Sequence, residues 1–162
     1  VERLKHAAEI FLEMEADQRV RVVVANTGAG HSLPTGLTDM RQMWLEVTLV
    51  DSEGNIVYKT GVPDENHELP EDTVIFNTVF GDGNGNPVIN IAKAKEILSD
   101  TRIPVGESAS HLFELNPAPQ SGCKLTARLL YRSMPQKILN QLPGEPLGPL
   151  PVVEMAAVYK IF

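Results

Sequence analysis

The sequence predicts a mainly β fold, an antiparallel β-sandwich of the immunoglobulin-like kind, with about seven strands and few short helices. Three observations support this prediction. Segments rich in β-branched and alternating apolar residues recur at short intervals along the 162 residues. These segments are half-polar, which is typical of antiparallel strands with one solvated face. Long loops join them, and no regular crossover helices separate them.

The chain opens with a predicted helix, and strands follow. Leu4, Ala7, Phe11 and Met14 recur at helical spacing, so residues 3–16 are expected to form an amphipathic helix of about four turns. Beyond this segment the apolar spacing changes to the two-residue period of a strand. The predicted strands are residues 19–25, 41–50, 56–60, 73–80, 107–115, 123–131 and 152–161.

Turns and two short helices complete the predicted elements. Residues 51–55, D-S-E-G-N, are a hairpin turn signal. Residues 91–98 have the pattern of a short helix, and another opens at Pro135, since proline suits the first helical position. Trp44 is expected in the core. His111 lies on the apolar face of its predicted strand and is expected to be a core histidine.

Composition excludes several classes of function. The chain is 43% hydrophobic, which is too apolar for a disordered protein, and no apolar run approaches the length of a membrane helix. The net charge of −7 argues against nucleic-acid binding. The single cysteine, Cys123, excludes an internal disulfide, a thiolate zinc site and a CxxCH heme attachment within this chain. No catalytic constellation of nucleophile and base emerges.

The densest motif is N-T-G-A-G-H-S-L-P-T-G, residues 26–36. Glycines allow close backbone approach or positive φ angles, and Pro34 restricts both its own backbone and that of Leu33. His31 is therefore displayed on a shaped loop, with Gly30, Pro34, Thr35 and Gly36 as the residues that shape it. A neutral imidazole in such a loop can ligate a metal, or it can simply hydrogen-bond its own loop.

A second candidate is D-G-N-G-N-P, residues 82–87. Asp82, Asn84 and Asn86 stand at alternate positions, as at the start of a calcium loop. An EF-hand is excluded, because Pro87 stands where that loop needs glycine and Lys93 where it needs glutamate. A looser oxygen-ligand calcium site and a plain turn of residues tolerant of left-handed geometry both stay open, and the turn is favoured.

The third candidate is the acidic loop of residues 63–72, which holds Asp64 and His67 among further carboxylates. Charge runs in loops are usually solvated, and carboxylates around a histidine favour its protonated form. The same residues are also candidate ligands of a divalent metal. Spacing does not choose between these two interpretations, although solvation is the commoner outcome.

The ordered set of motifs resembles a known family. The residues 26–36 loop, Arg41, M-W-L-E-V at 43–47 and D-S-E-G at 51–54 are similar to the β-sandwich domain that follows the heme-bearing part of certain multiheme c-type cytochromes. Later pieces keep the order, namely G-D-G-N-G at 81–85, D-T-R-I-P at 100–104 and A-R-L-L-Y-R at 127–132. The resemblance spans about residues 19–135, and its Gly-His-x-x-Pro-Thr-Gly core is moderately specific.

This resemblance implies a C-terminal accessory domain of an exported, periplasmic or extracellular electron-transfer protein. Residues 1–17 would be the tail of an upstream heme-bearing region, and residues 18–162 the sandwich. The resemblance implies heme c in the parent protein, no heme bound covalently in this chain, and His31 as a candidate axial ligand. Its expected partner is the heme-bearing part of the same protein or a redox partner, with no nucleic acid and no membrane span.

Another function class stays open beside this one. The acidic 63–72 loop and the Asp82 loop are also compatible with a calcium- or carbohydrate-binding sandwich module of an extracellular protein. A calcium-dependent rise in melting temperature distinguishes that class, because a ligand that binds only the folded state stabilises it.

Overall fold

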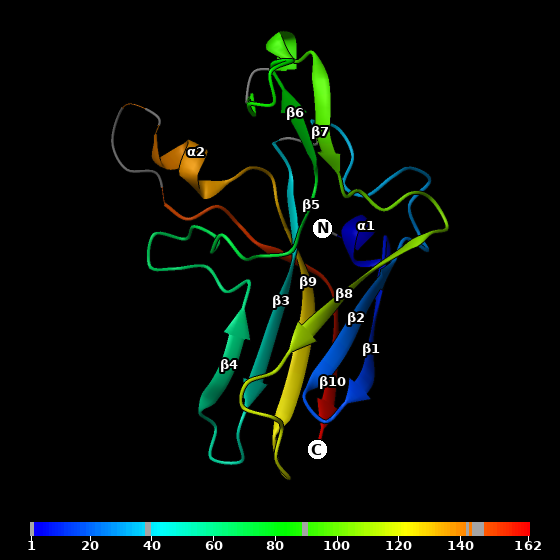
Figure 1. The fold of residues 1–162 in the computed structure, drawn as a ribbon, viewed down its shortest axis with the longest axis vertical. Helices are drawn as coiled ribbons and strands as arrows, with labels where there is room; N and C mark the ends of the chain where they lie inside the picture. The colour runs from blue at the N-terminus through cyan, green and yellow to red at the C-terminus, as the bar shows by residue number, and fades with distance from the viewer. Residues whose placement is uncertain (1, 38–39, 89–90, 142, 144–147) are drawn as a thin grey trace.

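The computed structural model describes residues 2–37, 40–88, 91–141, 143 and 148–162. Within these ranges ten strands and only short helices are present, and two antiparallel sheets face each other (Figure 1). The predicted mainly β sandwich is therefore confirmed. The strand number exceeds the predicted seven because residues 9–16 and 96–100 are strands and residues 73–80 are divided between two.

The smaller sheet contains three antiparallel strands in the order β1, β2, β8. Its members are β1 (Glu9–Ala16), β2 (Arg19–Ala25) and β8 (Ser108–Glu114). The valines at alternate positions of β2 form its inner face, and all three are fully buried: Val20, Val22 and Val24. This is the period-two burial that the sequence predicts for residues 19–25.

The larger sheet has the order β10, β9, β3, β4, with a short strand β5 also paired to β3. Its members are β3 (Gln42–Val50), β4 (Ile56–Thr60), β5 (Ile75–Phe76), β9 (Lys124–Arg132) and β10 (Val153–Ile161). The turn between β3 and β4 is the predicted hairpin. The β3 residues Met43, Leu45, Val47 and Leu49 are buried against the smaller sheet.

Trp44 faces the other side of β3 and is nevertheless fully buried, as predicted. Its indole Nε1 donates a hydrogen bond of 2.9 Å to the carbonyl of Gly61. The Arg132 guanidinium lies 5.4 Å from the centre of the ring. Cys123 is a buried free thiol in the main core.

A two-stranded ribbon projects from the sandwich beyond β5 (Figure 1). It consists of β6 (Thr78–Gly81) and β7 (Glu96–Asp100), joined through a 3-10 turn η1 (Ile91–Lys93). Two helices remain, α1 (Glu2–Lys5) and α2 (Gln136–Asn140), the latter following Pro135 as predicted. No helix in the described ranges is long and apolar enough to span a bilayer.

Two helix predictions are wrong. The helix expected over residues 3–16 is limited to α1, and residues 9–16 form β1, which pairs with β2 from Glu9 opposite Ala25 onward. Residues 91–98 form a single 3-10 turn followed by the first residues of β7. In both segments, pairing with a neighbouring strand overrides the helical preference of Glu, Leu, Met and Ala.

The burial that the sequence pattern predicts for His111 is also wrong. It is paired with Val22 and so belongs to the inward face of β8, yet the residue is exposed. The reason is that β8 is the last strand of the smaller sheet, so its inner face is only partly covered. The prediction of a core histidine is wrong, although the face was predicted correctly.

Candidate functional site

The His31 loop, residues 26–36, starts where β2 ends and is closed from inside by Asn26. This side chain is 1% exposed. Its Nδ2 donates to the carbonyls of His31 at 2.9 Å and Ile103 at 3.0 Å, and its Oδ1 accepts from the Ala29 amide at 3.3 Å. A buried amide with three such bonds fixes the loop, because breaking any of them leaves a polar group without a partner.

The second half of the loop is held by a backbone bridge. Leu33 and Ile103 exchange N–H···O bonds of 2.9 and 2.8 Å, and both residues are buried. The peptide bond between Leu33 and Pro34 is cis, and Pro34 is buried. Thr35 and Gly36 are exposed, with Gly36 at a φ of 84° that glycine adopts readily.

The His31 side chain is exposed, and its hydrogen bond favours one tautomer. Nδ1 lies 3.1 Å from the Ser32 carbonyl. A carbonyl only accepts, so Nδ1 carries the proton, and in the neutral ring Nε2 presents its lone pair. Nε2 has no hydrogen-bond partner among the described residues. Metal-ligating histidines are commonly held this way, with the other ring nitrogen bonded to a carbonyl.

A cavity of about 510 Å³ adjoins His31. One side of it is the His31 loop, and another is the N-terminal segment with α1. Its floor is formed by Met43, Tyr131 and Met155 from β3, β9 and β10. A mostly apolar hollow of this size with a few polar groups, here including His6 and His31, has the usual character of a small-molecule or cofactor site.

Gly30 and Gly28 behave differently within this loop. A Cβ atom placed on Gly30 would meet nothing within 4 Å, so the expected shaping role of Gly30 has no steric support. A Cβ on Gly28 would lie 1.7 Å from the His6 carbonyl oxygen. Gly28 is thus the glycine that allows the loop backbone to approach the backbone of His6. The motif indicates that a glycine allows close backbone approach in this loop. The sequence alone does not show that this glycine is Gly28 and not Gly30.

The Asp64–His67 loop closes on itself. The Asp64 Oδ1 accepts from the amides of Asn66 at 2.9 Å and Glu68 at 2.8 Å. The Asp64 amide in turn donates to the Glu68 carbonyl at 2.9 Å. His67 has a φ of 61°, in the left-handed region. The carboxylate that suggested a metal ligand is therefore already an acceptor for its own loop.

This loop is anchored to β9 through Arg132, which is 2% exposed. The guanidinium donates from Nη1 to the His67 carbonyl at 2.5 Å and from Nε to Gln42 Oε1 at 2.6 Å. Burial lowers the pKa of the Arg132 guanidinium, while the nearby Glu68 carboxylate opposes that shift. The sequence did not single out Arg132 as an anchor, since the loop and β9 are far apart in the chain.

The Asp82 loop follows β6 at the outer end of the ribbon and has the same internal closure. Its Asp82 Oδ1 accepts from the amides of Asn84 at 2.8 Å and Asn86 at 3.2 Å, and Oδ2 accepts from the Asn86 side chain at 3.1 Å. The Asn86 side-chain bond, followed by the Asn84 backbone bond, lowers the pKa of Asp82. From β7, Glu96 Oε1 accepts from the amides of Gly83 and Gly85, both at 3.0 Å.

Taken over the described ranges, no three or more His, Cys, Asp or Glu side chains are grouped so that they could hold a metal ion. Asp64 and His67 lie in a loop anchored to β9, whereas Asp82, Asn84 and Asn86 lie at the end of the ribbon. The geometry therefore brings the two candidate sets to different places and leaves each as a hydrogen-bonded turn.

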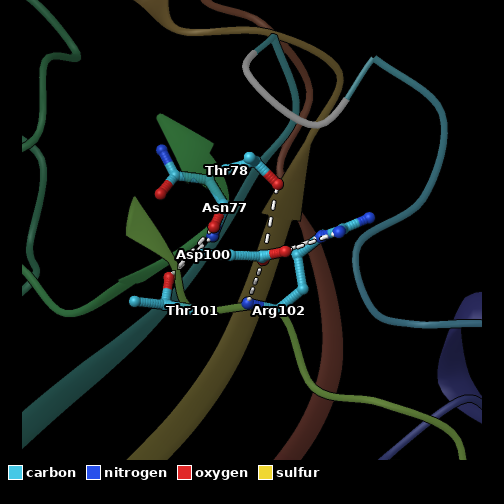
Figure 2. Close-up of polar contacts among 5 residues, drawn as sticks. All are labelled: Asn77, Thr78, Asp100, Thr101 and Arg102. Atoms are coloured by element: carbon cyan, nitrogen blue, oxygen red, sulfur yellow. Dashed lines mark hydrogen bonds and ion pairs between the residues drawn. The ribbon is translucent and has the colours of Figure 1, made fainter. Parts of the chain in front are cut away.

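The D-T-R segment at residues 100–102 fixes the base of the ribbon (Figure 2). Asp100 and Arg102 form an ion pair, with Nη2 and Oδ2 2.5 Å apart, and Asp100 Oδ1 accepts from Thr78 Oγ1 at 3.4 Å. The Thr101 hydroxyl accepts from the Asn77 amide at 3.0 Å. The Arg102 side-chain bond lowers the pKa of the Asp100 carboxyl. The segment joins β7 to β6 and has a structural role.

No family model matches the chain, and no curated protein matches it. Among solved structures, the chain is similar to a penta-heme cytochrome c552 from Thermochromatium tepidum, with 22% sequence identity and a TM-score of 0.72. The similarity covers 99% of this chain but 41% of that chain. At this identity the likeness establishes a shared fold, and the chain spans less than half the length of the cytochrome that it matches.

Proposed function

We propose that this chain is a non-catalytic accessory domain of an exported multiheme c-type cytochrome that takes part in electron transfer. The observation that carries the proposal is the fold, which is similar over 99% of the chain to part of a penta-heme cytochrome. The order of motifs around residues 26–36, 100–104 and 127–132 supports the same family independently of the fold.

In this proposal the heme c groups belong to the heme-bearing part of the same protein or to a redox partner. This chain has one cysteine, Cys123, which is buried and cannot provide a CxxCH attachment. Such cytochromes work outside the cytoplasm, so the proposed location is periplasmic or extracellular. The domain would cover a heme, position the cytochrome or dock its redox partner.

His31 is the proposed axial ligand of one of those hemes. Three features of the residue support this role: it is exposed, its Nδ1 donates to the Ser32 carbonyl, and its Nε2, beside a cavity, has no partner in the part of the chain that the structure describes. A bound heme supplies one-electron transfer, and the protein's part is to hold the ligand and tune its surroundings. Asn26 would keep the ligand loop rigid, since it bonds the His31 carbonyl.

The test uses the complete reading frame that contains this chain, expressed in a host that attaches c-type heme. We expect several CxxCH motifs upstream of residue 1 and a heme count to match. His31→Ala should alter the absorption and electron paramagnetic resonance spectra of one heme. His111→Ala is the matched control, because His111 is also exposed but does not line the His31 cavity.

Two results would count against the proposal at different levels. If the His31→Ala protein has the heme spectra of the wild type, His31 is not an axial ligand, and the accessory role stands without it. If the complete reading frame encodes no CxxCH motif and the protein carries no heme, the cytochrome proposal itself fails.

A further inference from the structure

The N-terminal segment, residues 2–8, lies across one side of the His31 cavity. It includes α1 and supplies Leu4, His6 and Ala7 to the cavity lining. The cavity floor beneath contains Met43 and Met155, which are 0% and 3% exposed. Residues 2–8 therefore form a strap over a floor that is otherwise apolar.

Gly28 holds this strap to the His31 loop. Its amide donates to the Ala7 carbonyl at 3.1 Å. A Cβ atom at this position would lie 1.7 Å from the His6 carbonyl oxygen and 2.8 Å from its carbon, which no side-chain rotation relieves. Only glycine therefore permits this approach of two backbones.

If that contact is forced apart, the strap yields rather than the loop. The loop is fixed by the buried Asn26 and by the Leu33–Ile103 bridge. In contrast, no side chain of α1 is buried, and the buried residues of the strap are Ala7 and Ala8, whose side chains are small. Segments with few buried contacts open at the lowest free-energy cost.

We propose that residues 2–8 are a releasable strap that closes the His31 cavity, and that Gly28 is its latch. Release uncovers the floor at Met43 and Met155 and widens the cavity beside His31 Nε2. Docking closes the cavity around its ligand. Only the identity of that ligand, a heme, rests on the proposed function; the latch is a property of this chain alone.

The experiment measures oxidation of the five methionines by hydrogen peroxide, resolved by mass spectrometry. Met14, Met40 and Met134 are half-buried and serve as internal references. Gly28→Ala should raise the oxidation rate of Met155 and Met43 by about tenfold relative to these references. Gly30→Ala is the matched control and should leave all five rates unchanged, because its Cβ would meet no atom within 4 Å.

A second variant releases the strap from the opposite side. Leu4→Asp removes an apolar contact of the strap with the core and leaves the loop untouched. It should reproduce the Met155 and Met43 result and speed trypsin cleavage after Arg3 and Lys5. Should Gly28→Ala fail to fold, as judged by the near-ultraviolet circular dichroism of Trp44, Leu4→Asp decides the question.

Two outcomes overturn the inference. In one, the folded variants keep Met43 and Met155 protected and the strap resistant to trypsin. In the other, all five methionines oxidise faster together, which reports loss of the core rather than release of a strap. Neither measurement involves heme, so a protein without heme would defeat the proposed function and leave the latch result unaffected.

Discussion

The His31 loop and the loops that begin at Asp64 and Asp82, called here the two acidic loops, differ in which residue binds the loop backbone. In the His31 loop the buried Asn26, at the end of β2, binds the loop backbone from inside. His31 Nε2 is left without a hydrogen-bond partner among the described residues. In the acidic loops the candidate ligands Asp64 and Asp82 themselves bind the loop backbone. Whether a side chain is available to a ligand depends on which residue satisfies the loop.

The acidic loops are two examples of one five-residue turn, and the β3–β4 hairpin is a third. In each, the first residue's amide donates to the fifth residue's carbonyl, at 2.9 Å from Asp51, 2.9 Å from Asp64 and 3.0 Å from Asp82. The Asp Oδ1 accepts from the amides of the third and fifth residues. We call these the Asp-closed turns. The fourth residue always has positive φ: Gly54, His67 and Gly85.

The largest expected effect comes from removing the support of the His31 loop. Asn26 is itself buried, and Asn26→Ala removes the hydrogen-bond donor of the Ile103 carbonyl in a buried contact and the partners of the His31 carbonyl and the Ala29 amide in part-buried ones. We expect the free energy of unfolding to fall by about 2–3 kcal/mol, since each unsatisfied buried group costs about 1–3 kcal/mol. Urea denaturation followed by Trp44 fluorescence measures the loss.

The control for this change is Asn55→Ala, which removes an exposed amide bonded to Asp51 at 3.0 Å. It should cost well under 1 kcal/mol, because the exposed groups rebind water. Equal losses in the two variants would mean that the His31 loop is no better supported than an Asp-closed turn, and the contrast between the regions would collapse.

The sequence predicted the regular part of the fold well and the site only in part. Alternation located β2 at its observed bounds, because its burial has period two, and the hairpin turn and apolar composition located β4 and β10 to within a residue. Residues 9–16 were wrongly predicted as helix. Ile10, Leu12 and Met14 alternate toward the core as in a strand, but Glu, Leu and Met also favour helix. Only the pairing with β2, a tertiary contact, decides between them.

The site shows the same division between local and long-range information. The motif identified the His31 loop, yet Asn26 reaches Ile103, 77 residues away, and Gly28 contacts Ala7. No local pattern encodes such contacts. The Asp-closed turns could be anticipated, since Asp followed by residues that tolerate positive φ is a local signal. The turn at Asp64 is harder to recognise in the sequence, because His67 stands where the other two turns have glycine.

The fourth position of the Asp-closed turns offers the next test. His67→Gly should raise the free energy of unfolding by about 0.5–1 kcal/mol, because a left-handed backbone costs an L residue roughly 1–2 kcal/mol. The hydrogen bond that Arg132 Nη1 donates to the His67 backbone carbonyl survives the change. Gly54→Ala and Gly85→Ala should destabilise by about 1 kcal/mol. A destabilising His67→Gly would show that the imidazole has a role in its loop.

Acid should weaken the Asp-closed turns and not the Asn26 support. Hydrogen bonds from Asn55 and Asn86, first of all from their side chains, lower the pKa values of Asp51 and Asp82 below the ordinary value. A lowered folded-state pKa contributes stability above the unfolded pKa, about 3.9, and that stability is lost as pH falls through the folded pKa. Asp51→Asn with Asp82→Asn should flatten the loss of stability between about pH 4 and pH 2.

The measurement is a series of urea midpoints across that pH range for the wild type, the double variant and Asn26→Ala. Asn26 does not titrate, so Asn26→Ala should lower every midpoint and keep the wild-type slope. A double variant with the wild-type slope would indicate that other carboxylates, such as Asp100 with its Arg102 partner, dominate the acid response.

The smallest expected effect is that of calcium, and it separates the accessory-domain proposal from a calcium-binding module. Calcium takes six to eight oxygen ligands, whereas the Asp82 carboxylate already accepts three hydrogen bonds from Asn84 and Asn86. We therefore expect millimolar calcium to leave the melting temperature unchanged. A real site at 100 times its dissociation constant would add about 2.7 kcal/mol, a large shift. If such a rise occurs and Asp82→Ala abolishes it while Asp51→Ala does not, the Asp82 turn is a metal site, and the equivalence of the three turns is wrong.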